Sequence, residues 1–341
     1  MLKGRLSGNR WAKSAKPVDV DCAQPGLAVP RNFVGGGYNW EMNLGKKDAR
    51  RTEQRLAASK TLDRMTAAEI VRLMNREDRK VAVAVERVLP AIARGADAIV
   101  EAVRGGGRLM YVGAGSSGRM AVLDAAEITP TFGVPRETIR AYIAGGRYAV
   151  TGAVEGAEDD EDAGVAALRL ARVGKGDVVV GIAASGTTPY VLAAIDYARG
   201  RGATTIAITS NEHMPLAQLA EIAISVDIGP EVLTGSTRLK AGTAQKMVLN
   251  MLSTAAMVRL GHAYENLMID AVMTNEKLQE RAVRILVEAS GAEVSAAEDA
   301  LRAAGHSMRV GLVMLKLGVG AGVARKKLAA ARGDLRLALG E

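Results

Sequence analysis

The stretch from Arg108 to Gly133 constrains the fold of this chain more than any other. It opens with an apolar run at 109–112, which has the length and the β-branched and aromatic content of a buried strand. The next residues are Gly113-Ala114-Gly115-Ser116-Ser117-Gly118, which contain too much glycine to continue a strand, and a helical pattern follows at 120–127. A strand, a glycine turn and a helix in this order direct backbone N–H groups at an anion. The stretch therefore predicts a phosphate-binding turn.

Two further features of this stretch bear on chemistry. Ser116 and Ser117 place hydroxyl donors at the turn. Glu127 falls about three turns into the helix, or just past its end, because Pro130 is expected to stop the helix. A phosphate-binding turn and a carboxylate on one element indicate chemistry on a phosphorylated small molecule.

The same design recurs later in the chain. An apolar strand at 177–182 runs into the turn Ser185-Gly186-Thr187-Thr188, and a helix follows at 190–199. Further strands are predicted at 139–143, 204–209 and 222–228. Because helical segments alternate with these strands, we expect an α/β fold with a doubly wound, five-stranded parallel sheet covered by helices on both faces. Ligands of such sheets bind beyond the carboxyl ends of the strands, so the two turns should converge on one site.

The chain divides into three predicted parts. Residues 1–51 lack periodicity and contain three prolines and a triple glycine, so we interpret them as a disordered or loosely docked extension, with a partner-binding tail as the alternative. Residues 52–270 form the α/β domain with its N-terminal helices, and residues 271–341 form a C-terminal helical bundle.

Three helices are predicted before the first strand. One begins at the capping box Thr66-Ala67-Ala68-Glu69, one spans 81–89 and ends at Pro90, and one spans 92–103. Together they should form a helical hairpin that leads into the sheet.

Composition excludes several classes of protein. Apolar residues make up 48% of the chain, which is too many for a disordered protein. No run approaches the roughly 18 consecutive apolar residues of a membrane span, and the basic start at 1–16 lacks the apolar core of a signal peptide. Cys22 is the only cysteine, which excludes a disulfide framework and a thiolate metal cage. We therefore expect a cytoplasmic protein that does not bind membranes.

Neither nucleic acid nor a metal ion is expected as a partner. Six of the eight net positive charges fall within residues 1–51, so the folded part lacks the basic excess of a nucleic-acid-binding domain. His213, His262 and His306 are far apart in sequence, and none forms a pair at helical spacing, which argues against a zinc site.

A dinucleotide site is the main alternative for the first turn. Gly113, Gly115 and Gly118 also match the Gly-x-Gly-x-x-Gly pattern. That pattern needs an acidic residue about 20 positions on, at the end of the second strand, where this chain has Ala144-Gly145-Gly146. The hydroxyl-rich second turn suits a phosphate or sugar hydroxyls better. A purely structural glycine turn is the third alternative.

Several longer motifs resemble those of a known family. Beside the two turns, the runs GPEVLTGSTRLKAGTAQKMVLNMLST at 229–254 and NLMIDAVMTNEKL at 266–278 are long and specific. They resemble the N-acetylmuramic acid 6-phosphate etherase family, which is built on the sugar isomerase (SIS) phosphosugar-binding domain. The likeness covers residues 52–341.

The resemblance implies a reaction that needs no cofactor. The family splits the C3 lactyl ether of N-acetylmuramic acid 6-phosphate by eliminating D-lactate and adding water, which gives N-acetylglucosamine 6-phosphate. By motif, its two carboxylates are Glu127 and Glu158 here. We expect Glu127 to protonate the departing lactate and then to activate water, and Glu158 to remove the C2 proton, although the pair is better determined than this division of roles.

The resemblance also implies substrate contacts and a homodimer with each site near the subunit interface. The predicted substrate-binding residues are Ser116, Ser117, Gly118, Ser185, Gly186, Thr187, Thr188 and Lys240. Arg238 is a further candidate, and both it and Lys240 could equally serve structure or an interface. A non-catalytic phosphosugar sensor and an aldose–ketose isomerase are the alternative functions on the same fold.

The chain departs from the usual motifs of the family at four positions. Thr187 replaces an arginine in the second turn, and Ala126, Ile128 and Thr129 replace serine, cysteine and proline around Glu127. These changes would alter substrate contacts or the surroundings of Glu127.

Overall fold

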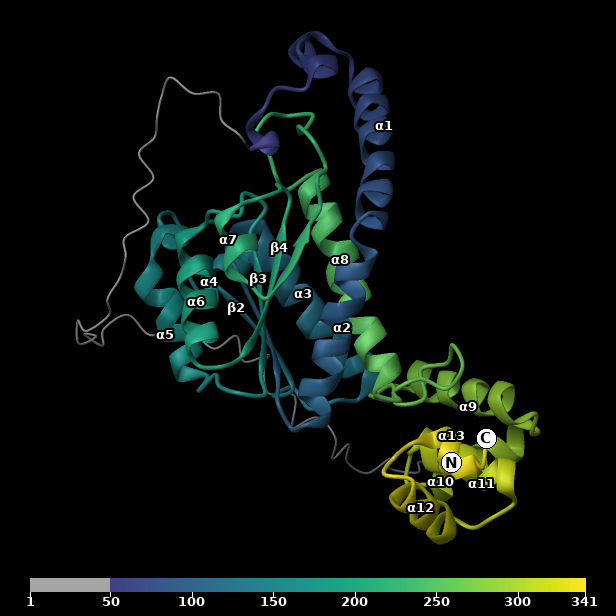
Figure 1. The fold of residues 1–341 in the computed structure, drawn as a ribbon. Helices are drawn as coiled ribbons and strands as arrows, with labels where there is room; N and C mark the ends of the chain where they lie inside the picture. Colours follow the sequence, from purple (N-terminus) through teal and green to yellow (C-terminus); the bar gives the residue numbers. More distant parts are fainter. Residues whose placement is uncertain (1–49) are drawn as a thin grey trace, which may run out of the picture.

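A computed structural model of the chain describes residues 50–341, so the extension predicted at 1–51 lies almost entirely outside the described residues. Its centre is a five-stranded parallel sheet with the strand order β2-β1-β3-β4-β5 (Figure 1). The strands are β1 (Leu109–Gly113), β2 (Ile139–Ile143), β3 (Val178–Ile182), β4 (Thr204–Thr209) and β5 (Ile222–Ser225). The predicted α/β class and parallel sheet are confirmed, and only β5 is clearly shorter than predicted.

Side chains that alternate along each strand build a core on both faces of the sheet. Leu109 and Tyr111 of β1 pack on one face, whereas Met110 and Val112 pack on the other. The first face is covered by α1 (Ala67–Glu86), α2 (Leu89–Arg104), α3 (Gly115–Phe132) and α8 (Lys240–Arg259). The second face is covered by α5 (Glu161–Leu170), α6 (Pro189–Gly200) and α7 (Pro215–Leu219). Both faces are apolar because a parallel sheet is buried on both sides.

The order of the strands reverses between β1 and β3. From β1 the chain steps outward to β2, and then it returns to the other side of β1 to build β3, β4 and β5. Gly113 at the end of β1 pairs with Ile182 at the end of β3. The two predicted turns therefore leave the sheet side by side, at the edge where ligands of such sheets bind.

The N-terminal helices differ from the prediction in number. The capping box at Thr66 is confirmed, because the Thr66 N–H donates to Glu69 Oε2 at 2.7 Å and the Glu69 N–H donates to Thr66 Oγ1 at 3.4 Å. The first two predicted helices form the single helix α1. Pro90 does not end a helix but lies in the first turn of α2, where a missing N–H breaks no hydrogen bond.

The prediction that Pro130 stops the first-turn helix is wrong. Helix α3 continues through Pro130 to Phe132, and Gly133 then ends it in the left-handed conformation, with φ +67° and its N–H donating to Thr129 O. The proline removes one hydrogen bond close to the end of the helix. Ile128 and Phe132 remain packed in the core, and this packing holds the last turn in place.

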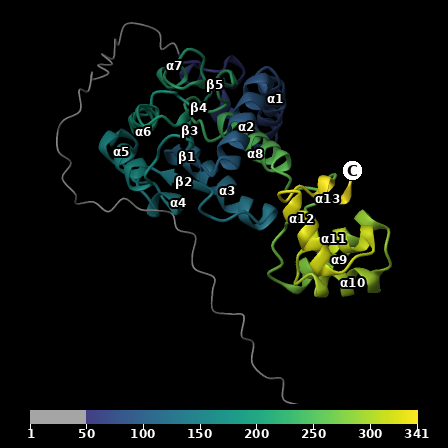
Figure 2. The same cartoon turned by 60° about the horizontal axis from the view of Figure 1, so that its bottom comes forward.

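The C-terminal residues form a separate group of helices beside the sheet (Figures 1 and 2). These are α9 (Glu276–Ser290), α10 (Val294–Ala303), α11 (Met308–Leu317), α12 (Ala321–Ala330) and α13 (Leu335–Leu339). Their core includes the fully buried Leu286 and Leu312, and Tyr264 and Ile269 of the preceding segment belong to it as well. None of the helices within residues 50–341 is both long enough and apolar enough to span a membrane.

Candidate functional site

The first turn places its two serines differently. Both lie in the first turn of α3, whose N-cap residue Ala114 makes no side-chain capping bond. Ser117 is buried and accepts a hydrogen bond from Gln245 Nε2 of α8 at 3.0 Å, whereas Ser116 is half-buried. Ser116 and the first N–H groups of α3 are thus the more accessible donors for an anion.

Gly118 serves the close packing of this turn. A Cβ atom at Gly118 would lie 2.5 Å from Ile143 Cγ1 and 2.9 Å from Gly113 O. The absence of a side chain therefore lets α3 start directly over the ends of β1 and β2. This contact fixes the position of the N–H groups that follow β1.

The second turn is a compact arrangement of hydroxyl groups. Ser185 Oγ accepts hydrogen bonds from Thr187 N at 3.2 Å and from Thr187 Oγ1 at 3.1 Å. Gly186 has φ +73°, and a Cβ atom there would lie 2.4 Å from Met214 Cβ. Thr188 is the N-cap of α6, with Pro189 in the first turn. Ser185, Thr187 and Thr188 are half-buried, so they are available to a ligand at this edge of the sheet.

Glu127 lies at the opposite end of the sheet from the two turns. It is exposed on α3, and it follows Ser116 by eleven residues, which corresponds to roughly 16 Å along the helix axis. It lines a cavity of about 520 Å³ with Arg140 at the start of β2, and another of about 550 Å³ with Asn250 and Asn266. Both cavities are built partly by the 266–278 segment.

Glu158 lies beside α6, the helix that follows the second turn. It belongs to the short 3-10 helix Ala157–Asp159, which is followed at once by α5. Helix α5 packs closely against the start of α6. The contact leaves no room for a side chain at Gly164, where a Cβ atom would lie 2.2 Å from Tyr190 O. Neither cavity lined by Glu127 contains Glu158. Because Glu127 lies far along α3 from the first turn whereas Glu158 lies beside α6, one copy of the chain keeps the two predicted carboxylates apart.

Asp124 is a buried acid that the sequence analysis did not single out. It is 5% exposed and lines the second cavity with Glu127, one helical turn further along the same face of α3. Burial raises the pKa of Asp124, although hydrogen bonds from Tyr111 Oη at 2.9 Å and Ser253 Oγ at 3.1 Å oppose the shift. In the sequence, only the spacing of three residues between Asp124 and Glu127, which places both on one face of a helix, could have identified Asp124.

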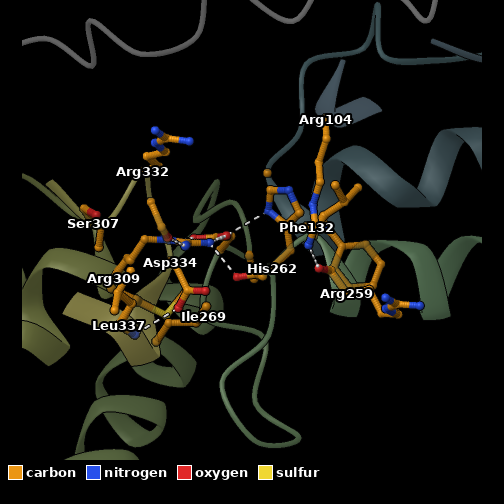
Figure 3. Close-up of a pocket in the computed structure, with 18 of the residues that line it drawn as sticks. Arg104, Phe132, Arg259, His262, Ile269, Ser307, Arg309, Arg332, Asp334 and Leu337 are labelled. Carbon is orange, nitrogen blue, oxygen red and sulfur yellow. Dashed lines mark hydrogen bonds and ion pairs between the residues drawn. The ribbon is translucent and has the colours of Figure 1, made fainter. Parts of the chain in front are cut away.

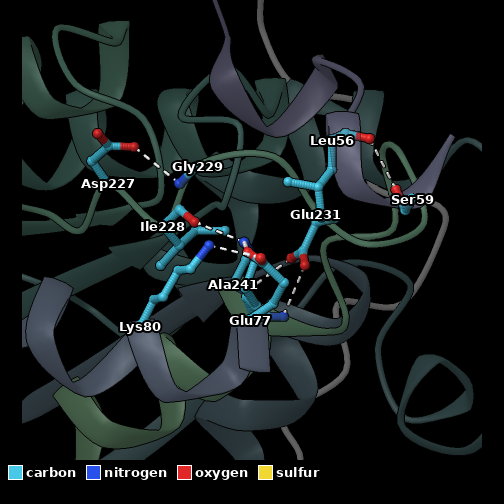
Figure 4. Close-up of polar contacts among 10 residues, drawn as sticks. Leu56, Ser59, Glu77, Lys80, Asp227, Ile228, Gly229, Glu231 and Ala241 are labelled. Carbon is cyan, nitrogen blue, oxygen red and sulfur yellow. Dashed lines mark hydrogen bonds and ion pairs between the residues drawn. The ribbon is translucent and has the colours of Figure 1, made fainter. Parts of the chain in front are cut away.

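Lys240, predicted as a substrate ligand, is 1% exposed within a buried charge cluster at the start of α8. Figure 4 labels Glu77, Ile228 and Glu231 of this cluster. Its Nζ donates to Glu77 Oε2 at 3.2 Å and to Ile228 O at 2.9 Å. Burial opposes ionisation of Glu77, but hydrogen bonds from Lys80 and Lys240 lower its pKa. These contacts give the Lys240 amine structural partners, whereas Arg238 is exposed.

Glu231 completes this cluster by capping α8. It is fully buried, and its carboxylate accepts hydrogen bonds from Lys240 N at 3.1 Å and Ala241 N at 3.0 Å. Burial raises the pKa of Glu231, and the two N–H groups lower it by a smaller amount. The cluster therefore fixes the segment 229–239 between β5 and α8.

A third cavity, of about 760 Å³, lies where the C-terminal helices meet the end of α8 (Figure 3). Asp270 lines this cavity, pairs with His262 Nδ1 at 2.8 Å and accepts a hydrogen bond from Arg309 Nε at 3.0 Å. Burial opposes ionisation of Asp270, but these bonds lower its pKa. The cavity contains neither of the predicted carboxylates, and its ion pairs connect the C-terminal helices to the rest of the chain.

No metal centre is present in the part of the chain that the structure describes. Within residues 50–341, no three His, Cys, Asp or Glu side chains lie close enough together to hold a metal ion.

Two protein-family models match parts of this chain. Residues 91–199 match the glucokinase regulatory protein N-terminal SIS domain, and residues 157–255 match the SIS domain. A phosphoheptose isomerase from Francisella tularensis superposes over 57% of this chain and all of its own, with 18% identity and a TM-score of 0.45.

Curated relatives match over most of the chain. An N-acetylmuramic acid 6-phosphate etherase from Symbiobacterium thermophilum is 54% identical over 79% of this chain and 89% of its own length. Etherases of the same name from Pectobacterium atrosepticum and Serratia proteamaculans are 50% and 53% identical, over 84% and 87% of this chain and 95% and 99% of their own lengths.

Proposed function

Because this chain belongs to the N-acetylmuramic acid 6-phosphate etherase family, we propose that it cleaves N-acetylmuramic acid 6-phosphate to N-acetylglucosamine 6-phosphate and D-lactate. The observation that carries the proposal is identity of about half over 89–99% of the relatives' lengths. The two hydroxyl-lined turns at one edge of the sheet support a phosphosugar substrate. The reaction would make the protein a carbon–oxygen lyase.

In the proposed reaction, two carboxyl groups move the protons. Glu158 removes the proton from C2, and Glu127 protonates the ether oxygen at C3 as the C3–O bond breaks, so that lactate leaves with its oxygen. Glu127, now a carboxylate, takes a proton from water, which adds to the unsaturated sugar at C3 while the proton on Glu158 returns to C2. A positioned general acid and a general base each contribute roughly 10²–10⁴-fold to the rate.

We assign the phosphate to the two turns. The half-buried Ser116 and the first N–H groups of α3 form one side of this subsite. Ser185, Thr187 and Thr188 form the other, and Gly118 and Gly186 let the two turns pack closely against the neighbouring parts of the chain. Ser117 is hydrogen-bonded to Gln245, and Lys240 is hydrogen-bonded to Glu77. We therefore give these two side chains a structural role and do not assign them to the phosphate.

Two copies of the chain are needed to complete the site in this proposal. Glu127 lies roughly 16 Å along α3 from the first turn, whereas Glu158 lies beside α6, the helix that follows the second turn. A homodimer in which Glu127 of one protomer approaches the turns of its partner would bring both acids to one substrate. Because a doubly charged sugar phosphate does not cross a membrane unaided, we place the reaction in the cytoplasm.

The direct test is incubation of the purified chain with N-acetylmuramic acid 6-phosphate and EDTA, with D-lactate measured. We expect lactate release in EDTA, and a loss of about 10²–10⁴-fold for Glu127→Gln and for Glu158→Gln. Glu155→Gln, on the same exposed segment as Glu158, is the matched control and should remain active. Binding without lactate release would indicate a sensor, and a ketose product would indicate an isomerase.

A further inference from the structure

The segment at the start of the described chain is attached to the ligand-binding edge of the sheet. Thr52 is fully buried, and its N–H donates to Asn211 Oδ1 at 3.2 Å. Asn211 Nδ2 donates in turn to Thr52 Oγ1 at 3.1 Å. Thr52 O accepts a further hydrogen bond from Gly235 N at 3.3 Å, and Arg51 pairs with Asp227. Figure 1 shows this segment in purple beside the green segment 229–239.

Asn211 connects this segment to the second turn. It is 2% exposed, and its Nδ2 also donates to Ala184 O at 3.0 Å. Ala184 is the residue directly before Ser185, and the same carbonyl accepts the Ser210 N–H at 3.0 Å. The backbone of Asn211 is fixed as well, because Thr209 Oγ1 donates to Asn211 O at 2.9 Å. Every hydrogen-bonding group of the Asn211 side chain is therefore used to hold either Thr52 or the start of the turn.

We propose that Asn211 is a positioning residue for the phosphosugar subsite, and that Thr52 holds Asn211 in the orientation that fixes the Ser185–Thr188 turn. The hydroxyl and N–H groups of the turn can bind a phosphate only if the turn starts in the right place and direction. A displacement of about 1 Å in a binding group can cost on the order of 10²-fold. The inference rests on the proposed function, since it assigns the substrate phosphate to this turn.

The decisive variant is Asn211→Asp, which keeps the shape and the acceptor for Thr52 N but replaces the Nδ2 donor with an oxygen. That oxygen would face Ala184 O and repel it. We expect KM for N-acetylmuramic acid 6-phosphate and Kd for N-acetylglucosamine 6-phosphate to rise on the order of 10- to 10²-fold, with a smaller change in kcat. Asn75→Asp, on the exposed face of α1, is the control and should leave all three unchanged.

Two substitutions at Thr52 should change KM and Kd less than Asn211→Asp does. Thr52→Val removes the hydroxyl that Asn211 Nδ2 binds and should raise both constants several-fold in the same direction. Thr52→Ser retains the hydroxyl and should restore wild-type values. If Asn211→Asp does not fold, the Thr52 variants test the inference instead. Unchanged KM and Kd in a folded Thr52→Val protein would then overturn it.

A folded Asn211→Asp protein with unchanged KM and Kd would overturn the inference, and so would a lower melting temperature with no change in either constant. Failure of the proposed function gives a different result, namely a wild-type protein that releases no lactate. The Kd of N-acetylglucosamine 6-phosphate across the variants then still decides whether Asn211 positions the turn.

Discussion

At the scale of single residues, burial separates side chains that support the site from those that can meet a ligand. Lys240 has the charge expected of a phosphate ligand, but its Nζ lies between Glu77 and Ile228 O. Ser117 has the hydroxyl expected of a phosphate ligand, but it accepts a bond from Gln245. Ser116 remains half-buried at the same turn. Neighbouring residues of one motif can therefore serve structure and binding separately.

Lys240→Met should lower stability and leave substrate affinity intact. The substitution removes the Nζ partner of the buried Glu77 and leaves that carboxylate with Lys80. Leaving a buried charge without a partner costs about 3–5 kcal/mol, and because Lys80 remains paired with Glu77 we expect a smaller loss of stability. Chemical denaturation should report this loss, whereas KM of the folded protein should not change. Lys175→Met, at an exposed position, is the control; a raised KM at full stability would instead make Lys240 a substrate ligand.

At the scale of elements, contact between the glycine turn and the neighbouring strand sets where α3 begins. Gly118 lies against Ile143 of β2 and Gly113 of β1, and no side chain fits between them. Helix α3 then runs back along the sheet, so the same element that starts at the glycine turn carries Glu127 to the far end. The length of α3 thus determines the separation of turn and carboxylate.

Gly118→Ala should disturb both folding and phosphate binding. The new methyl group would lie 2.9 Å from a backbone oxygen that cannot rotate away. Overpacking of this kind costs about 1–3 kcal/mol and shifts the helix start. We expect a lower melting temperature together with a raised KM. Gly174→Ala is the matched control, because a Cβ atom there meets nothing within 4 Å.

At the scale of the whole molecule, the proposed site needs two copies of the chain. If Glu127 and Glu158 of one site come from different protomers, co-expressed Glu127→Gln and Glu158→Gln chains would assemble some dimers with one intact site. Random pairing should restore about a quarter of wild-type lactate release, although each variant alone releases lactate about 10²–10⁴-fold more slowly than wild type. Absence of any restored activity in proven mixed dimers would place both glutamates of a site on one protomer.

The attachment of the C-terminal helices should depend on pH through Asp270. Because its pKa is lowered in the folded state, Asp270 contributes stability above about pH 4, the ordinary value for aspartate, and this contribution is lost as the pH falls through the lower folded-state value. Asp270→Asn should lower stability at pH 7 by about 2 kcal/mol and flatten this acid dependence in thermal melts. Asp299→Asn, in an exposed ion pair with Arg302, should change neither.

The sequence by itself determined the parallel sheet, the two turns and the capping box of α1. These features depend on local patterns: apolar runs of strand length, glycine between strand and helix, and a side chain that caps its own helix. The same local reasoning failed at Pro130 and Pro90, where packing and position in the first turn outweigh the usual effect of proline.

Only the tertiary structure decided which polar side chains are bonded to distant parts of the chain and which stay accessible. Lys240 and Glu77 are 163 residues apart, Asn211 and Thr52 are 159 apart, and Ser117 and Gln245 are 128 apart. Local sequence patterns do not encode such pairs, because the partners meet only when helices and loops close over the sheet. The separation of Glu127 from the turns has the same origin: it follows from the direction in which α3 runs across the sheet, a property of packing rather than of sequence spacing.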